Sequence, residues 1–378
     1  MTQPRHRAAI ECARSDDPAL ADRLDPVYIG VPARWMDLWE RHGRFRGLQL
    51  YYLLWQLLLL RRVRKLHHAL AFDVGHHVTM STDWIPTGLA FVHELPVVWG
   101  PLGGAEQVPD ACRPYLGASG RFTERMRSVT TRPMRSLLAA RAGRRCALLV
   151  AQNDQEAATL RSLGPPVVVR PNVFLDDDIY RSLGEEPISE HSPPSDLLGT
   201  AHVAVFAGRL LAWKGVHAAL ATMRRPEMAE WRLLVFGDGP ERRRLRAAVR
   251  EWGLEDRVSL LGHRPRSELL RALRTADAFL FPSMREAAGW VVGEALAVGC
   301  PVVCLDTGGP PRLLRGTGHA VTPGPRLLED LAEALQACIG GPREVVRWDR
   351  HGIGDLLTDW YGDAASGLPR PDEVIDHV

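Results

Sequence analysis

The sequence predicts an α/β protein of two domains, each built on a parallel, doubly wound sheet. The length of 378 residues suits two domains of ordinary size. A hydrophobic content of 46% supplies enough apolar material for two cores. In the C-terminal half, short β-branched runs alternate with amphipathic segments of helical length. Such alternation with short connections is typical of parallel sheets covered by helices.

We expect the C-terminal domain to span residues 201–342. The ligands of an open parallel sheet lie beyond the carboxyl ends of its strands. The loops that follow these strands are therefore where we expect the functional residues. The expected strands are 202–207, 232–236, 258–261, 278–281 and 301–305, and the expected helices are 216–223, 241–252, 267–274 and 290–298.

A second α/β domain is expected over residues 1–182. Residues 183–200 contain proline-rich sequences without an apolar period, which is typical of an interdomain linker. Residues 343–378 are expected to form a C-terminal helix and tail. The expected strands of the N-terminal domain are 73–79, 96–99, 146–151 and 167–170.

Charge and cysteine content exclude several kinds of partner. The formal net charge is +2, so no global attraction to nucleic acid is expected. The six cysteines are scattered and form neither a disulfide framework nor a metal-binding CxxC pattern. A reducing cytoplasm is the expected location.

Two segments raise the question of membrane contact. Residues 48–60 are apolar but too short to span a bilayer, so we expect a helix buried on a sheet, with an interfacial membrane helix as the alternative. Residues 121–145 are basic and amphipathic, which favours a solvated helix face over a membrane patch. Peripheral contact with the inner face of a membrane stays open as an alternative.

Two of the expected loops are rich in glycine. Gly208 and Arg209 follow the first strand of the C-terminal domain, and Lys214, one of only two lysines, lies shortly after them. Two cations beside glycines suit a diphosphate, although a surface pair of cations is the alternative. Gly237 and Gly239 follow the next strand, where a tight turn explains them equally well.

A third loop leads into the expected helix at residue 290. Ala287, Ala288 and Gly289 have almost no side chain, so the amides at the helix start are accessible. Together with the helix dipole, these amides predict an anion site. Glu286 precedes the helix and Glu294 lies more than a turn inside it, so the two carboxylates can address different parts of one ligand.

Together these loops resemble the signature of retaining glycosyltransferase family four, whose members have the GT-B fold. The resemblance covers essentially the whole chain and is most specific from residue 203 to residue 314. It implies two facing Rossmann-like domains with parallel sheets. It also implies that the C-terminal helix crosses back onto the N-terminal domain.

The resemblance also implies roles for the loop residues. Arg209 and Lys214 would hold the donor diphosphate, and Glu286 would contact the transferred sugar; these three form the expected catalytic set. Glu294 would bind the ribose. The remaining donor-binding residues would be Gly208, Gly237, Gly239, Ala287, Ala288 and Gly289.

In the N-terminal half, residues 76–79 and 99–106 resemble the acceptor-side loops of the same family. Many relatives have a histidine after the strand that matches residues 97–99. This chain has Gly100-Pro101 there, so we expect no catalytic histidine at that position. His76 and His77 could belong to the acceptor site, and the alternative is that they lie beside the core of the strand. The expected acceptor-side residues are Gly103, Gly104, Glu106 and His77.

Two further interpretations follow from the resemblance. The chain opens with a segment that resembles the part of the family after its early strands, so we expect the first strand–loop–helix unit to be missing and the N-terminal sheet to be weaker. Asp176-Asp177-Asp178 follows Pro171-Asn172, which resembles the domain junction. We interpret these acids as solvated rather than as a metal motif, and expect no required metal or other cofactor.

The function implied is transfer of a sugar, with retention, from an NDP-sugar of the UDP or GDP type to a hydroxyl of a glycan, a lipid or a natural product. The partners are then the nucleotide-sugar and the acceptor, and the oligomeric state is left open. A sugar-nucleotide epimerase of the same fold is one alternative. A non-catalytic or impaired nucleotide-sugar-binding protein is another.

Overall fold

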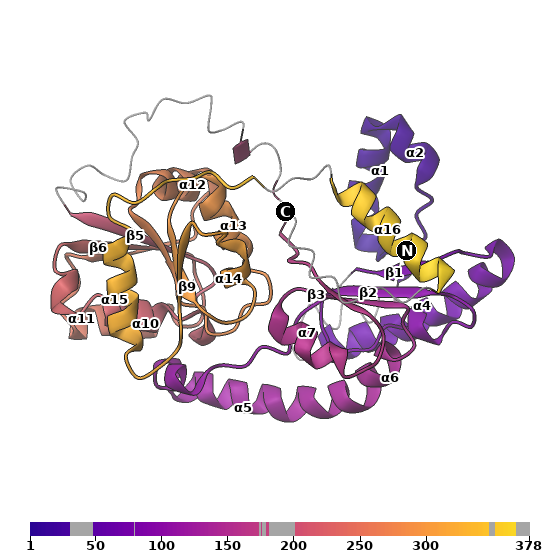
Figure 1. Ribbon diagram of the computed structural model, residues 1–378, viewed down its shortest axis with the longest axis horizontal. Coiled ribbons are helices and arrows are strands. Elements are labelled where there is room, and N and C mark those ends of the chain that lie inside the picture. Colours follow the sequence, from indigo (N-terminus) through magenta and orange to yellow (C-terminus); the bar gives the residue numbers. More distant parts are fainter. Residues whose placement is uncertain are drawn as a thin grey trace.

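The computed structural model describes residues 1–30, 48–78, 80–173, 175, 179–180, 201–347 and 352–367. These residues form two α/β domains that lie side by side (Figure 1). The expected parallel sheets are confirmed. The interpretations of residues 176–178, of the linker at 183–200 and of the final tail fall outside the described residues.

The C-terminal sheet has six described strands in the order β10-β9-β8-β5-β6-β7. All the pairings are parallel, and the order reverses beside β5, which pairs with β6 on one side and with β8 on the other. In a doubly wound sheet this switch point opens a crevice at the carboxyl ends of the strands. The strands are β5 (His202–Ala207), β6 (Trp231–Phe236), β7 (Val258–Gly262), β8 (Ala278–Phe281), β9 (Val302–Leu305) and β10 (Gly318–Val321).

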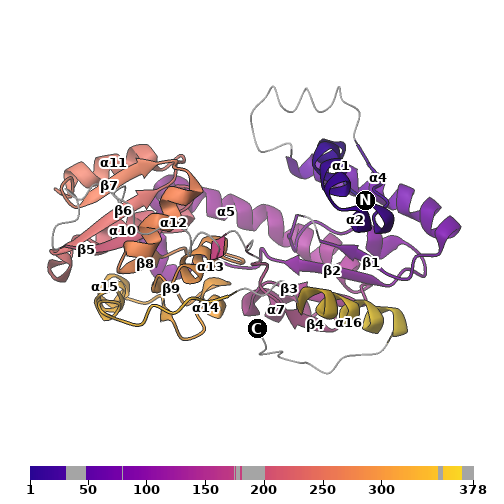
Figure 2. The ribbon, with the colours of Figure 1, turned by 90° about the horizontal axis from the view of Figure 1, so that it is seen from above.

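Six α-helices of this domain surround its sheet in the described residues (Figures 1 and 2). The four helices expected from the sequence are confirmed, with each end shifted by at most one residue. Strand β10 was not expected, because two of its four residues are exposed and it lacks a β-branched run. The helices are α10 (Val216–Thr222), α11 (Arg242–Glu251), α12 (Arg266–Thr275), α13 (Trp290–Ala297), α14 (Pro310–Leu313) and α15 (Leu327–Ala337).

The described N-terminal sheet has four parallel strands in the order β1-β2-β3-β4. Strand β2 runs three residues further than expected, and its register with β3 shifts between Trp99 and Leu102. Strand β1 is short and pairs with β2 at the edge of the sheet. The strands are β1 (Gly75–His77), β2 (Val97–Leu102), β3 (Leu148–Ala151) and β4 (Val167–Val169).

Helices cover both faces of this sheet. On one face, α4 (Leu48–Leu70), a π-helix (Arg135–Ala139) and α6 (Ala140–Gly143) pack around Trp99. On the other face lies α16 (Gly352–Ser366), whose Trp360 and Ala364 pack against β2 and β3. Figure 1 shows α16 above the sheet and α4, α5 and α6 below it. The last described helix of the chain thus packs on the N-terminal domain. The other N-terminal helices are α1 (Arg7–Asp16), α2 (Pro18–Arg23), α5 (Gly117–Met134) and α7 (Asp154–Arg161).

Helix α4 includes the apolar segment noted in the sequence. Its inner side chains, among them Tyr52, Trp55 and Leu59, are buried against the sheet, as expected for a core helix. Leu50 and Leu57 on its outer side are 65% and 59% exposed. Among the described residues, the helices are each too short or too polar to cross a bilayer.

The two histidines of β1 point to opposite faces of the sheet, as successive residues of a strand do. His77 is buried beneath α4, with its Nε2 2.8 Å from the Tyr52 hydroxyl and 3.2 Å from Nε2 of Gln56. His76 faces α16, and its Nδ1 lies 2.8 Å from the Tyr361 hydroxyl. Burial lowers the pKa of His77 to about 4. The structure therefore places His77 in the domain core rather than on an acceptor-side surface.

Two loops at the carboxyl edge of the C-terminal sheet pack together through glycine. A Cβ atom built on Gly215, whose φ is +76°, would lie 1.8 Å from the carbonyl oxygen of Pro282 in the loop after β8. A Cβ atom on Gly237 would lie 1.9 Å from the carbonyl oxygen of Gly208. Since real contacts are never this short, these glycines fix how closely the loops after β5, β6 and β8 approach one another.

The buried His77 predicts a pH-dependent stability. Its pKa is lower in the folded state, so between pH 6.5 and about 4 the unfolded chain binds the extra proton. The contribution of His77 is therefore complete above pH 6.5 and is lost as the pH falls, by up to about 1.4 kcal/mol per pH unit. We expect the free energy of unfolding, measured by urea titration, to depend less on pH in this range in His77→Gln than in the wild type. Parallel profiles of the two proteins between pH 7 and pH 4.5 would contradict the assignment.

The close approach at Gly215 predicts a large cost for a single methyl group. Gly215→Ala is compared with Gly253→Ala, because Gly253 also has a positive φ of +61° but has no atom within 4 Å of a built Cβ. Both variants carry the conformational cost of a left-handed alanine, about 1 kcal/mol, and only the first adds a steric clash. We expect Gly215→Ala to lower the free energy of unfolding by at least about 2 kcal/mol more than the control. If urea titrations gave the two variants equal losses of unfolding free energy, the loops would have moved apart to accommodate the methyl group, contrary to this prediction.

Candidate functional site

Lys214 and Glu286 form an ion pair between the loops after β5 and β8. Their side chains are 20% and 18% exposed, so the pair is largely screened from solvent while still reachable by a ligand. The Ser283 hydroxyl lies 3.4 Å from Oε2 of Glu286, and the Lys214 ammonium lies 5.4 Å from the ring centroid of Phe281. Two of the three residues expected to be catalytic are therefore in direct contact.

The third, Arg209, lies on the same edge of the sheet. It is exposed and follows Gly208, whose amide donates to the Phe236 carbonyl over 3.1 Å. On the other side of Arg209, the Leu210 amide donates to the Asp238 carbonyl over 2.9 Å. These two bonds tie the Arg209 backbone to the loop after β6.

The start of α13 lies directly after Glu286. Gly289 is the N-cap residue, with a φ of +86°, and no side chain caps this end of the helix. Because the first-turn amides of a helix have no partner within it, an uncapped start attracts anions. The amide of Gly309 donates to the Glu286 carbonyl over 2.9 Å, so the loop after β9 supports this turn from behind. The sequence patterns did not reveal this support.

Glu294 lies on α13, one turn beyond the helix start. Its Oε1 accepts a hydrogen bond of 2.6 Å from Nε of Arg266 on α12. The Glu294 side chain is 17% exposed, and that of Arg266 is 47% exposed. Arg266, which the sequence analysis did not single out, orients the carboxylate that was expected to bind a ribose.

On the N-terminal domain, the loop at residues 103–106 is held by buried carboxylates. Glu106 is 2% exposed, and its Oε2 accepts from the Gly104 amide over 2.9 Å. Glu156 is fully buried and accepts from the Ala105 amide over 2.9 Å. Burial, with nearby Asp83 adding to it, raises the pKa of Glu156 well above its usual value. Glu106 thus lies beneath the loop as a brace, while Gly103 is buried and Gly104 is half-buried next to Asp83.

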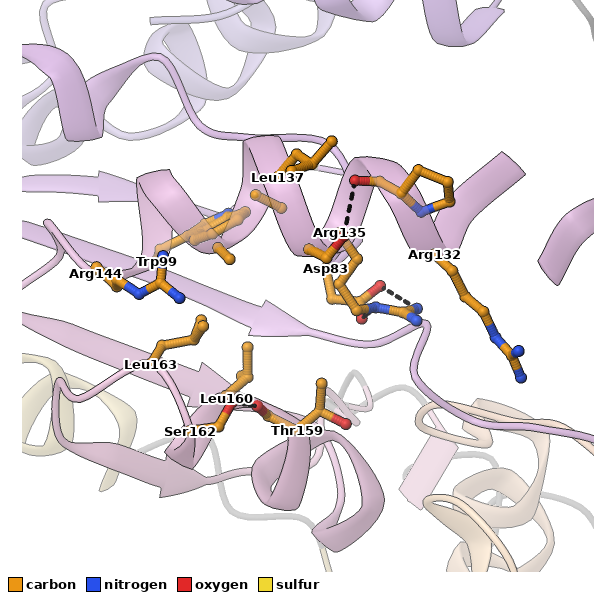
Figure 3. A pocket seen from close by; sticks show the side chains of 14 residues that line it. Asp83, Trp99, Arg132, Arg135, Leu137, Arg144, Thr159, Leu160, Ser162 and Leu163 are labelled. Carbon is orange, nitrogen blue, oxygen red and sulfur yellow. Dashed lines mark hydrogen bonds and ion pairs between the residues drawn. The ribbon is translucent and has the colours of Figure 1, made fainter. Parts of the chain in front are cut away.

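Two arginines hold the same loop from the other side. Arg135 forms an ion pair with Asp83 (Figure 3). It also donates to the Gly104 carbonyl over 2.8 Å. Arg127 donates to the carbonyls of Gly104 and Glu106. Burial raises the pKa of Asp83, while the hydrogen bond and the charge of Arg135 oppose that rise. The loop is therefore fixed by charged groups that are themselves neutralised or paired.

The two loops meet across the domain boundary. A Cβ atom on Gly103 would lie 2.5 Å from the Cβ of Ala287, so only glycine fits there. Asn153 donates from Nδ2 to Oε1 of Glu106 over 2.6 Å and to the Ala287 carbonyl over 3.0 Å. One side chain therefore binds both the N-terminal loop and the loop that carries Glu286.

Charged pairs extend this contact between the domains. Arg285 reaches Glu124 of α5 over 3.1 Å, and Arg312 reaches Asp154 of α7 over 2.9 Å. Within the part of the chain that the structure describes, histidine, cysteine and carboxylate side chains form no group of three that could hold a metal ion. Metal independence stays a prediction.

The sequence analysis missed Asn153, although a signal was present. Asn153 follows strand β3 and caps α7, accepting from the Glu156 amide over 2.9 Å. An Asn three residues before a Glu at a helix start is the capping-box pattern. Here the Glu156 side chain serves the 103–106 loop instead of the cap.

Asn153 is therefore expected to have two separable roles. Asn153→Ala removes both the cap and the bridge to Ala287, whereas Asn153→Ser keeps a capping hydroxyl but cannot span both partners. We expect the alanine variant to lose about 2–4 kcal/mol of unfolding free energy, since Glu106 also loses a donor, and the serine variant about 1 kcal/mol less than that. Chemical denaturation measures both. Two variants of wild-type stability would show that the bridge is unimportant.

Comparisons with known proteins agree with this architecture. Residues 188–353 match the sequence profile of the family described as "Glycosyl transferases group 1". The chain is 32% identical over 179 residues to the putative colanic acid biosynthesis glycosyltransferase WcaL of Escherichia coli K12, which covers 45% of this chain and 42% of that protein. It is 33% identical over 169 residues to 2-deoxystreptamine glucosyltransferase of Streptomyces kanamyceticus, covering 43% of each. The chain thus spans less than half the length of these two relatives.

Solved structures show the fold. The chain is similar to Anabaena HepE in complex with UDP, with a TM-score of 0.55 at 20% identity, over 82% of this chain and 75% of that one. It is also similar to a sucrose-phosphate synthase from Thermosynechococcus elongatus, with a TM-score of 0.52 at 19% identity, over 83% and 76% of the two chains. The expected fold is confirmed, while membership of family four and the missing first unit stay predictions. The chain has the GT-B fold, and its family match and named relatives support a glycosyltransferase.

Proposed function

We propose that this protein transfers a sugar from a nucleoside-diphosphate sugar to a hydroxyl group, with retention at the anomeric carbon. The observation that carries the proposal is the Lys214–Glu286 ion pair, which lies beside the uncapped start of α13 and next to the domain contact at Ala287. The family profile match includes this whole segment, from the loop after β5 to α13.

In this proposal the donor diphosphate lies against three positive groups. Arg209, Lys214 and the first-turn amides of α13 stabilise the negative charge that develops on the leaving group. Glycine at 208 leaves room for the phosphates to approach the backbone closely, whereas Gly237 and Gly239 let the loop after β6 pack against Gly208 and Leu210. Lys214 would then exchange part of its contact with Glu286 for the diphosphate, which frees an oxygen of Glu286 for a sugar hydroxyl.

Glu294 would bind the ribose of the donor, oriented by Arg266. A UDP or GDP type of donor is proposed because the HepE structure, which shares the fold, contains UDP. Glu294 lies one turn further along α13 than the helix start, so the nucleoside would extend away from the N-terminal domain. The sugar end would then point toward Gly103 and Gly104.

The acceptor is proposed to enter at the 103–104 backbone, which the buried carboxylates and Arg127 and Arg135 keep rigid. The reaction follows a front-face route without a metal. The acceptor oxygen forms a bond to the anomeric carbon on the face from which the diphosphate leaves, and the acceptor proton passes to a leaving phosphate oxygen. The contact between Gly103 and Ala287 shields this centre from water, which limits hydrolysis of the donor.

The ion pair provides the test. We expect Lys214→Ala and Glu286→Gln each to reduce transfer at least about 100-fold, because each removes a group that acts on the reacting sugar diphosphate. The matched control is Lys65→Ala, which removes the only other lysine, an exposed residue on α4. Release of UDP or GDP from a panel of nucleotide sugars measures turnover, and circular dichroism verifies the fold.

Transfer at the wild-type rate in either variant would refute the assignment. Analysis of the products with and without acceptor separates the alternatives. An altered free nucleotide sugar formed without acceptor would indicate an epimerase. Donor binding without any product would indicate a binding protein.

A further inference from the structure

One stretch of the N-terminal domain concentrates positive charge. Residues 117–145 contain eight arginines and one acidic residue, Glu124, in a chain whose formal net charge is only +2. Glu124 is directed inward, since its carboxylate pairs with Arg285 and lies 3.9 Å from Arg127. In the structure this stretch is α5, the π-helix and α6 (Figures 1 and 2). Arg127 and Arg135 are directed inward as well, and the other six arginines are exposed, so the outer surface is cationic.

The same surface exposes large apolar side chains. Phe122, Met126 and Val129 are 65%, 45% and 61% exposed, and their spacing of four and three residues places them in one row along α5. Leu137 and Leu138 of the π-helix, 70% and 48% exposed, continue the apolar surface. Scattered exposed apolar residues are ordinary, whereas a continuous row indicates a surface that contacts something apolar.

The outer side of α4 adds to this surface. Helix α4, the π-helix and α6 cover the same face of the N-terminal sheet, and α16 covers the opposite face. Leu50, Leu54 and Leu57 of α4 are exposed on the side that faces away from the sheet. In Figure 1, α4, α5 and α6 lie on the same side of the sheet, opposite α16.

Two hollows lined by arginine accompany the apolar row. A pocket of about 720 Å³ has Arg132 and Arg144 at opposite ends, with Leu137, Leu160 and Leu163 between them (Figure 3). A second pocket, of about 350 Å³, is shared between α5 and the segment at 107–116. The arginines that line the second pocket are Arg113, Arg121, Arg125, Arg127 and Arg132.

We propose that this face, formed by α5, the π-helix and the outer side of α4, docks onto a bilayer surface rich in anionic phospholipid. The exposed apolar side chains would enter the boundary between head groups and acyl chains, and the arginines would contact lipid phosphates. Guanidinium groups suit this role because they bind phosphate oxygens in a bidentate manner. A second copy of the chain fits poorly, since two such faces would oppose their arginine clusters.

Docking here would bring the membrane close to the proposed acceptor side. Helix α5 runs along both domains, and a Cβ atom on Gly120 would lie 2.7 Å from the Cβ of Ala212 in the C-terminal domain. Arg127 of the same helix holds the 103–106 loop. The inference itself rests only on the N-terminal surface and is independent of the proposed catalytic residues.

Vesicle flotation with the full chain tests the proposal. We expect binding to vesicles of phosphatidylcholine with about one third phosphatidylglycerol, weak binding to pure phosphatidylcholine, and release as salt rises. Phe122→Ser/Val129→Ser and Arg121→Gln/Arg125→Gln should each weaken binding at least about tenfold. These side chains are all exposed, so thermal unfolding should be unchanged.

Matched controls lie on the C-terminal domain. Arg243→Gln/Arg250→Gln makes the same charge change on α11, and Ile339→Ser/Val345→Ser removes exposed apolar side chains; both pairs should bind as the wild type does. Equal binding to both vesicle types, or equal effects of test and control variants, would overturn the proposal. So would a dimer in light scattering that dissociates in Phe122→Ser/Val129→Ser without any vesicle binding.

Discussion

The contact between the 103–106 loop and Ala287 is the constraint on which the proposed site depends. Because residue 103 is glycine, its backbone can pack directly against the Ala287 side chain, and Asn153 hydrogen-bonds to both loops. Because Ala287 follows Glu286 directly, this contact also fixes the position of the Lys214–Glu286 ion pair relative to the N-terminal domain. A residue that binds only one domain could position a donor, but joining donor and acceptor requires that the two loops keep a fixed separation.

The buried groups behind the 103–106 loop explain how a short glycine-rich segment can be rigid. Backbone amides of Gly104 and Ala105 donate to carboxylates that are almost fully buried, and the Gly104 carbonyl accepts from Arg127 and Arg135. A carboxylate buried without partners would be costly. The ion pair with Arg135 lowers the cost of burying Asp83. The raised pKa of Glu156 favours its neutral form, which is less costly to bury. The polar network therefore supports the loop instead of binding a ligand.

The sequence predicted one side of this arrangement far better than the other. The loops with Arg209, Lys214 and Glu286 each follow a short, mostly buried apolar strand, so local pattern and sheet geometry sufficed to bring them to one edge. The network on the N-terminal side joins Asp83 to Arg135 and Glu106 to Asn153, and pairings over such separations leave no local pattern. His77 shows the same limit, because strand alternation alone does not reveal which face of β1 meets α4.

The most direct test of the proposed site is binding of nucleoside diphosphates followed by hydrogen exchange. Calorimetry should show UDP or GDP binding at least about 100-fold more tightly than the matching nucleoside, since the phosphates contact Arg209, Lys214 and the start of α13. Bound diphosphate should slow amide exchange at residues 287–292. Equal affinity for nucleoside and diphosphate, or protection confined to the N-terminal domain, would contradict the account.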